Sequence, residues 1–554
     1  MIGVQTKPDQ RGIAAEFFEL FKTPWEFARS GERYDVLVCT CDEDFGGSAE
    51  LVLHYGSSQC AFDTTNKIGV TPHHGEVAFE FAGRRVPLYL PAVTFSESPL
   101  CLPLEGKKQE SVAFATKKNQ GVVVRLGYDL FDEIRHLLTK GQPPSNAASP
   151  TLDLHIALMR ELIVRSGQPL IEIPPAPDGY EFTVCLTHDV DHPVLRNHCL
   201  DHTMFGFVYR ATVGSVVDAC RGRISLGTLG RNLWAACRLP FVYLKLAEDP
   251  WRGFGRYLNI ESGLGSTFFV IPRKNQPGRL RDGSAPAKRA SGYSLDDISS
   301  ELSLIRAHGG EVALHGLDAW LDSNSGNTER GIVSKETGLD GIGVRMHWLY
   351  FDEQSYKVLD QAGFSYDSTF GYNETVGFRA GTAQAYRPPG AAKLIEMPLL
   401  VMDTALFYPA YLNLRPDEAR SLVLELLEDV ERFGGTLMIN WHDRSIAPER
   451  LWDCFYLTLV NELKQRHAWL PTATRAAAWY RKRRSVKFER FSREGESLKY
   501  RATFQQDLET PGLKVRVHPP QTLGLFDGGP MTVSKSYQES VLQADTDVTM
   551  AVAA

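Results

Sequence analysis

Residues 182–192 read Phe182-Thr-Val-Cys-Leu-Thr-His-Asp-Val-Asp-His192, an apolar run that ends in a cluster of carboxyl and imidazole groups. A short apolar run of this kind is typical of a buried strand. Three later apolar segments also end in a histidine: His315 follows Val312-Ala-Leu, His347 follows Gly343-Val-Arg-Met, and His442 follows Leu437-Met-Ile-Asn-Trp. We therefore expect several buried strands that carry polar side chains at their ends.

Helices that end in glycine separate these strands. Ser294 begins one helix, with Asp297 three residues later as in a capping box, and Gly309-Gly310 ends it before a strand at 311–315. The order repeats at 352–362 and at 416–433. Such repetition predicts an α/β fold of parallel strands joined by crossover helices. In these folds the carboxyl ends of the strands line the active site, so we expect the polar strand ends to meet.

The linker Ile173-Pro-Pro-Ala-Pro-Asp-Gly179 can continue neither a helix nor a central strand. We therefore expect an N-terminal α/β domain of unknown role at 1–172 and the repeated unit at 180–484. Alternating residues beyond it predict a small β appendage at 485–525. The segment 526–554 has little apolar patterning, and we expect it to be disordered.

Two insertions and one charged run need separate interpretation. Residues 200–248 are expected to be helical. The segment 273–293 is rich in Gly, Pro, Lys and Arg and is expected to be a mobile loop. The basic run 481–484 is interpreted as the solvated end of a helix.

The bulk properties exclude several classes of protein. A chain of 554 residues exceeds one compact core, so two or three domains are expected. Its net charge is −7, whereas a nucleic-acid binder is expected to carry a basic surface. We find no secretory signal and no stretch of membrane-spanning length. The nine cysteines contain no C-x-x-C, which fits free thiols in a reducing compartment. We expect a cytoplasmic protein of unknown oligomeric state.

The pair Asp189 and Asp191 suggests a metal. Taken alone, Asp-x-Asp is more often a solvated acidic turn, but three strand-end histidines in the same register shift the balance. Crowded carboxylates repel one another, and a divalent cation would relieve that repulsion. Mixed imidazole and carboxylate ligands predict Zn²⁺, with Co²⁺, Ni²⁺, Fe²⁺ or Mn²⁺ as alternatives, rather than Mg²⁺.

The chain from about 180 to 480 resembles the polysaccharide deacetylases, also called the NodB-homology domain or carbohydrate esterase family four. The further stretches that carry the resemblance are Ser266-Thr-Phe-Phe-Val-Ile-Pro272, Gly343-Val-Arg-Met-His347, Ala362-Gly-Phe-Ser-Tyr-Asp-Ser368 and Gly377-Phe-Arg-Ala-Gly381. The likeness is greatest to a branch with a T-H-D-V-D first motif and an N-terminal α/β domain. It implies an irregular (β/α) barrel that removes acetyl groups from an N-acetylated sugar or polysaccharide in bacterial surface or exopolysaccharide biosynthesis.

The resemblance also implies a set of metal ligands. His315 matches a metal-binding position of the family. The family's metal-binding aspartate stands next to the base, where this chain has Val190, so Asp191 is the candidate in its place. The second histidine of the family's H-[ST]-x-x-H motif is replaced by Ala319. We therefore expect His347 to be the third ligand, with Asp318 as the alternative.

Catalytic roles carry over in the same way. Asp189 matches the family's base, Arg345 the arginine that orients it, and His442 the histidine acid. Possible substrate contacts are Arg379, Arg387 and Asp403, and Asp367 lies near a further motif. Aromatic residues that could stack on a sugar ring are Trp348, Tyr350, Tyr372 and Trp441.

Two other functions stay open on the residues alone. The same water-activating groups would serve a hydrolase of cyclic amides or of other non-peptide C–N bonds. The missing second-motif histidine would also fit a non-catalytic glycan-binding protein. A second histidine cluster, formed by His188, His192, His198 and His202, is either a further metal site or a set of hydrogen-bonded loop residues.

Overall fold

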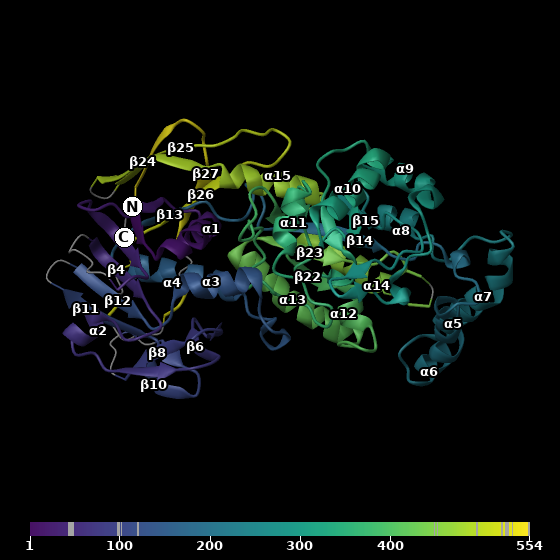
Figure 1. The fold of residues 1–554 in the computed structure, drawn as a ribbon, viewed down its shortest axis with the longest axis horizontal. Helices are drawn as coiled ribbons and strands as arrows, with labels where there is room; N and C mark the ends of the chain where they lie inside the picture. The colour runs from purple at the N-terminus through teal and green to yellow at the C-terminus, as the bar shows by residue number, and fades with distance from the viewer. Residues whose placement is uncertain are drawn as a thin grey trace.

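The structure, a computed structural model, describes residues 1–42, 49–96, 100, 102–118, 121–447, 449–450, 452–494, 497–521, 524–526, 531–533 and 536–551. The N-terminal region and the C-terminal strands lie together at one end (Figure 1). A central α/β unit follows, and a group of helices, α5 to α7, projects from its far side.

The central unit is built on one eight-stranded sheet in which every neighbouring pair is parallel, with the order β21-β20-β19-β18-β15-β14-β23-β22. This confirms the parallel α/β sheet predicted from the helix–glycine–strand repeats. The strands are β14 (Thr183–Val190), β15 (Ser266–Val270), β18 (Glu311–Gly316), β19 (Val344–Met346), β20 (Tyr366–Asp367), β21 (Ile395–Glu396), β22 (Leu399–Met402) and β23 (Thr436–Asn440).

The sheet curls because its two edge strands follow each other in the chain. Only Met397 and Pro398 separate β21 from β22, although the two strands occupy opposite ends of the sheet order. The three steps from Glu396 to Leu399 span at most about 11 Å, so the two edges have to approach one another. The described residues form no ladder between β21 and β22, and the sheet is a curled, open half-barrel.

Helices follow the strands as crossover connections. Those of the central unit are α8 (Phe254–Ile260), α9 (Ser299–Ala307), α10 (Ser323–Thr337), α11 (Ser355–Gln361), α12 (Asp403–Phe407), α13 (Pro416–Phe433), α14 (Asp453–Gln465) and α15 (Ala473–Arg484). The capping box of Ser294 and Asp297 is present. Helix α13 has the predicted bounds, whereas α11 begins three residues later than predicted because the Asp352 side chain first accepts a hydrogen bond from the Gln354 backbone N–H.

The N-terminal region contains two six-stranded sheets. One is mainly parallel, β11-β12-β4-β3-β1-β2, and the other is antiparallel, β5-β8-β10-β9-β6-β7. The antiparallel sheet was not predicted, because its short strands have weak apolar alternation. The elements are β1 (Ile2–Gln5), α1 (Arg11–Phe21), β2 (Trp25–Phe27), β3 (Tyr34–Cys39), β4 (Ala49–Tyr55), α2 (Ala61–Thr65), β5 (Val70–His73), β6 (Val77–Phe81), β7 (Arg84–Leu88), β8 (Ala92–Phe95), β9 (Pro103–Leu104), β10 (Lys107–Ser111), β11 (Ala113–Lys118), β12 (Gly121–Leu126), α3 (Leu130–Thr139), α4 (Thr151–Arg165) and β13 (Leu170–Glu172).

The C-terminal strands join the N-terminal region. They are β24 (Lys487–Glu494), β25 (Ser497–Thr503), β26 (Lys514–His518), β27 (Gln538–Val541) and β28 (Asp547–Ala551). Strand β26 pairs with both β13 and β27, and β28 pairs with β25. The disorder expected over 526–554 therefore does not hold for β27 and β28. Backbone pairing to a neighbouring edge orders these strands without the apolar pattern that the sequence analysis looked for.

The basic run 481–484 also differs from its interpretation as a solvated helix end. The Arg483 side chain is buried and donates hydrogen bonds to the carbonyls of Leu20 and Ile173, at 2.9 and 2.7 Å. Arg484 forms a bidentate pair with Glu16, with both N···O distances 2.7 Å. This end of α15 connects the central unit to the N-terminal region.

Both insertions are ordered. The first is helical as expected, with α5 (His202–Tyr209), a π-helical turn (Arg210–Gly214), α6 (Ser215–Cys220) and α7 (Leu226–Tyr243). The second, which includes the short strands β16 (Arg279–Leu280) and β17 (Gly283–Ser284), was expected to be mobile. Its Arg289 is instead buried and donates to the carbonyls of Leu317 and His347. Among the described helices, none has both the length and the apolar content needed to cross a bilayer.

Candidate metal centre

Strand β14 delivers the two carboxylates to one place. It lies between β15 and β23, and its pairing register brings Asp189 opposite Phe269. Residues two apart on a strand point to the same face, so Asp189 and Asp191 share one side while His188 faces the other. His188 is buried there between Glu261 and the Trp441 carbonyl, at 2.9 and 2.8 Å. His188 is therefore a hydrogen-bonded core residue.

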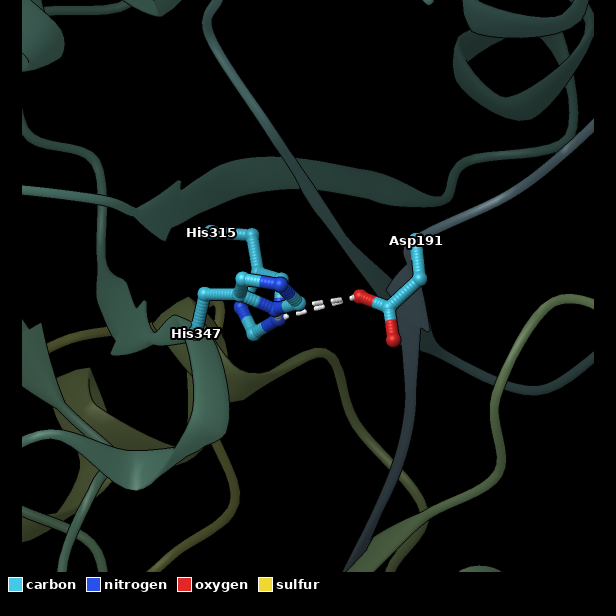
Figure 2. Close-up of side chains that lie close together, drawn as sticks. All are labelled: Asp191, His315 and His347. Carbon is cyan, nitrogen blue, oxygen red and sulfur yellow. Dashed lines mark hydrogen bonds and ion pairs between the residues drawn. The ribbon is translucent and has the colours of Figure 1, made fainter. Parts of the chain in front are cut away.

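Asp191, His315 and His347 meet at the carboxyl ends of three strands, β14, β18 and β19 (Figure 2). Asp191 Oδ1 lies 3.4 Å from His315 Nε2 and 3.3 Å from His347 Nδ1. The two imidazole nitrogens are 3.0 Å apart. Figure 2 shows the carboxylate directed at both rings. These are the three ligands that the sequence analysis predicted, and they converge on one point.

Backbone carbonyls fix the tautomers of both imidazoles. His315 Nδ1 lies 3.0 Å from the Arg345 carbonyl, and His347 Nε2 lies 3.1 Å from the Arg289 carbonyl. A carbonyl oxygen only accepts, so these nitrogens carry the protons. Burial lowers the pKa of His347 to about 4, which keeps its ring neutral near pH 7. The opposite nitrogens, His315 Nε2 and His347 Nδ1, therefore direct lone pairs at Asp191.

Three converging lone pairs fit a small divalent cation. Asp191 Oδ1 is buried and receives no hydrogen bond. Bond lengths of about 2.0–2.1 Å in a tetrahedral shell place neighbouring ligand atoms about 3.3 Å apart, close to the separations of 3.0–3.4 Å seen here. Each imidazole also has the carbonyl partner that commonly orients a ligating histidine. Of the described residues, only this group of His, Cys, Asp and Glu has metal-binding geometry.

Asp318, the alternative third ligand, lies outside this group. Its carboxylate accepts from the Arg279 backbone N–H at 2.6 Å and pairs with the Arg279 side chain at 3.3 Å. Asp318 therefore holds the 273–293 insertion, while His347 takes the place beside His315.

Asp189 is held by two donors. Its Oδ1 accepts from Arg345 Nη1 at 2.9 Å, and its Oδ2 accepts from Asn440 Nδ2 at 2.7 Å. Arg345 is fully buried, donates to Thr187 as well, and lies over the Phe269 ring at 4.3 Å. Burial alone would raise the pKa of Asp189, but the electrostatic effect of the adjacent His315 ring and of the Arg345 guanidinium outweighs it, and the pKa lies below its usual value. Asp189 is thus an ionised, oriented carboxylate.

His442 forms a dyad with Asp403, the first residue of α12. His442 Nδ1 donates to Asp403 Oδ1 at 2.6 Å, and Nε2 faces Asp191 Oδ2 at 3.8 Å. Burial would lower the pKa of His442, but the Asp403 carboxylate raises it to about 9. The ring is therefore protonated near pH 7. Asp403 was predicted as a substrate contact; it is fully buried and instead positions His442.

A cavity of about 600 Å³ opens over these groups, lined in part by Asp189, Asp191, His315, His347 and His442. Of the aromatic residues expected to stack on a sugar, Trp348 and Tyr350 line it. Trp441 is fully buried against Phe455, and Tyr372 donates to the Gln142 carbonyl. These two are structural.

Three other predicted residues do not line the cavity. Arg379 donates to the Gly371 carbonyl at 2.7 Å, and Arg387 meets Glu16 through its backbone N–H. Asp367 is buried and accepts from Thr369. All three have structural partners, so a role as substrate contacts is not supported for the two arginines.

The second histidine cluster does not form a metal site. His198 pairs with Asp201 at 2.8 Å, and His192 packs edge-on against His198. Their rings stabilise the loop that leads to α5.

Sequence reasoning missed two residues that shape the centre, Asn440 and Arg289, which hold Asp189 and His347. It named Asp403 but gave it another role; Asp403 holds His442 and could be found because it directly follows the apolar run Leu399-Leu-Val-Met402.

Comparison with known proteins gave distant likenesses only. No family model and no curated protein matches the chain. Among solved structures, a Mycobacterium smegmatis protein assigned as a polysaccharide deacetylase is 20% identical, covers 56% of this chain and 94% of its own, and has a TM-score of 0.35. The Puue allantoinase is 13% identical over 57% of this chain and 95% of its own, with a TM-score of 0.33. The carbohydrate deacetylase Agd3 is 10% identical over 99% of both chains, with a TM-score of 0.36. At these TM-scores none of the three similarities identifies the reaction. The chemistry is therefore argued from the geometry of the site.

Proposed function

We propose that this protein is a divalent-metal-dependent hydrolase that removes acetyl groups from an N-acetylated sugar or polysaccharide. The observation that carries the proposal is the convergence, on one cavity, of a three-ligand group, an ionised carboxylate and a protonated imidazole. The sequence resemblance to polysaccharide deacetylases gives the acetylated glycan as substrate and bacterial surface or exopolysaccharide biosynthesis as the setting.

Asp191, His315 and His347 would hold the cation, with Zn²⁺ the first choice for two imidazoles and one carboxylate. When bound, a divalent cation lowers the pKa of a water molecule and polarises a carbonyl group as a Lewis acid. The protein's contribution is to fix the ligand lone pairs through the carbonyls of Arg345 and Arg289.

Asp189 is the general base in this proposal. Arg345 and Asn440 each hold one oxygen of its carboxylate, so the group stays ionised and oriented. It would accept a proton from the water that attacks the acetyl carbon. Positioned proton transfer of this kind contributes about 10²–10⁴-fold to a rate.

His442 is the general acid. Asp403 holds its Nδ1–H, which leaves the Nε2–H directed toward the cavity. It would give this proton to the departing amine nitrogen as the C–N bond breaks, so that acetate and a free amino sugar leave. The side chains of Trp348 and Tyr350 provide an aromatic wall for the sugar ring.

Acetate release from N-acetylated chito-oligosaccharides by the Zn²⁺-loaded protein tests this proposal. Asp189→Asn is expected to lose at least about 100-fold in kcat while binding one equivalent of zinc. His315→Ala is expected to lose both zinc and activity. Asp318→Asn is the matched control, because Asp318 follows His315 by three residues but its carboxylate pairs with Arg279 outside the three-ligand group; it should keep both.

The two alternative functions, a cyclic-amide hydrolase and a glycan-binding protein, predict different results in this assay. Turnover of a cyclic amide without acetate release would move the assignment to a cyclic-amide hydrolase. A zinc-loaded protein that binds the acetylated oligosaccharide and releases no acetate would overturn the enzyme and favour a glycan-binding protein.

A further inference from the structure

The insertion between β14 and α8 has an unusual distribution of apolar side chains. We call residues 202–243, which comprise α5, the π-helical turn, α6 and α7, the hairpin. Helix α7 turns a stripe of residues at helical spacing outward. Leu226 is 82% exposed and Trp234 is 65% exposed. The further exposed members are Leu233, Cys237 and Phe241.

The other half of the hairpin repeats this arrangement. Along 205–217 the exposed apolar residues are Phe205, Tyr209, Val213, Val216 and Val217. The inner faces hold a small apolar cluster that includes Met204, Phe207 and Leu239. Beside it, buried Ser215 accepts a hydrogen bond from buried Asn232 at 2.8 Å. Surface helices of water-soluble proteins usually carry charged and polar residues on the outer face, so an outer face that is also apolar is unusual. The outer surface of the hairpin therefore lacks an apolar partner.

Charge on the hairpin is opposite to that of the whole protein. The hairpin, residues 202–243, has five basic residues and one acidic residue, a formal charge of +4, whereas the chain carries −7, and Lys245 follows directly after it. Arg221, Arg231, Arg238 and Lys245 form no ion pair with any described residue. Arg231 and Arg238 are seven residues apart on α7 and lie along one flank of its apolar stripe.

We infer that the hairpin is a membrane-docking element that inserts its apolar outer face into the surface of an anionic lipid bilayer. An exposed apolar face with Trp, Phe and Leu, flanked by unpaired basic side chains, is the pattern of helices that lie in the membrane interface. No described helix could cross the bilayer, so the hairpin would lie on it. The element projects away from the rest of the protein, and the N-terminal region would not obstruct its approach (Figure 1).

Docking of the hairpin would also bring the cavity close to the membrane surface. His202, Thr203 and Arg210 belong to the hairpin and line the same cavity as Asp191 and His442. The cavity would then face saccharides held at the bilayer surface. This consequence rests on the proposed function, whereas membrane docking does not.

Vesicle co-sedimentation of the full-length protein tests the inference directly. We expect binding to phosphatidylcholine vesicles that contain roughly a third phosphatidylglycerol, and little to pure phosphatidylcholine. Changing Arg221, Arg231 and Arg238 to Gln should weaken binding roughly 100-fold, at about fivefold per charge. Changing Leu226, Leu233, Trp234 and Phe241 to Ser should weaken it at least about 10-fold.

Matched controls distinguish binding through the hairpin from nonspecific adsorption to vesicles. Leu304, Leu339, Leu457 and Leu508 are exposed elsewhere, and their change to Ser should leave binding unaltered. The control for charge is the change of Lys335, Lys357 and Lys393 to Gln, which should also leave binding unaltered. Unchanged zinc content and melting temperature show that each variant folds.

Three results would overturn the inference. One is no binding of the wild type to the anionic vesicles at low salt, or equal binding to pure phosphatidylcholine. Another is equal binding by wild type and the four-serine variant. The third is a dimer in light scattering that the four-serine variant dissociates, because a second copy would then cover this face. Acetate release is not part of the readout, so failure here leaves the proposed function standing.

Discussion

Replacing Asp403 by Asn removes the charge that keeps His442 protonated. The Asp403 carboxylate raises the pKa of His442 from an ordinary 6.5 to about 9. Without that charge, burial remains, and the pKa should fall to 6.5 or below. At pH 8 a group with a pKa of about 9 is about 90% protonated, and one with a pKa of about 6.5 is about 3% protonated. We therefore expect a loss of about 30-fold in kcat at pH 8 and a small loss at pH 6.

The same variant has a predicted effect on stability. Because the pKa of His442 is raised in the folded state, its contribution is complete below pH 6.5 and is lost as the pH rises through about 9. A shift of about 2.5 units corresponds to roughly 3 kcal/mol. Asp403→Asn should therefore lower the free energy of unfolding at pH 6 by up to about 3 kcal/mol, and the two proteins should converge above pH 9.

The assay is the pH profile of kcat for acetate release, with urea unfolding at pH 6 and pH 9.5 alongside. An alkaline limb that stays in place in Asp403→Asn would refute the reasoning. His442→Gln supplies the control, because Asp403→Asn should cost no further activity in that background if it acts through the imidazole.

Three further predictions follow from the same geometry. Removing the metal with a chelator should lower the melting temperature, and added Zn²⁺ should restore it in a concentration-dependent manner by calorimetry; a melting temperature indifferent to Zn²⁺ contradicts the three-ligand site. Arg345→Met leaves the Asp189 carboxylate buried without its cation, and should cost about 3–5 kcal/mol in urea unfolding; a loss below about 1 kcal/mol would speak against that pairing. Gly343→Ala would place a methyl group 2.0 Å from the buried Tyr366 ring, so unfolding should show a loss of about 1–3 kcal/mol; a neutral result would mean that the ring moves freely.

The sequence was sufficient to predict which strand ends meet. Apolar runs and glycine-ended helices predicted the parallel sheet, and the rule for strand carboxyl ends then brought Asp189, Asp191 and His315 together. His347 joins them because β19 lies next to β18. This part of the site follows from periodicity that one chain displays by itself.

Residues that support the site could not be predicted in this way. Asn440 lies within β23 and looks like an ordinary strand residue, yet its side chain reaches across to Asp189. Arg289 sits in a segment whose composition predicts mobility, and it becomes fixed only because three carbonyls gather around its guanidinium. Such contacts depend on the tertiary arrangement, which has no local signature in the sequence.

The structure gives an independent physical reason to separate the roles of the two carboxylates in Asp-x-Asp. Asp189 has its own cation in Arg345, and Asp403 has His442. Asp191 has no Arg or Lys partner among the described residues, and its contacts are the imidazoles of His315, His347 and His442. His442 Nε2 lies 3.8 Å from Oδ2 of Asp191, while the buried Oδ1 of Asp191 has no hydrogen-bond partner among those residues. A divalent cation beside Oδ1 would offset the cost of burying that oxygen. In the proposed mechanism Asp189, which pairs with Arg345 and is oriented by Asn440, is therefore the carboxylate that exchanges a proton.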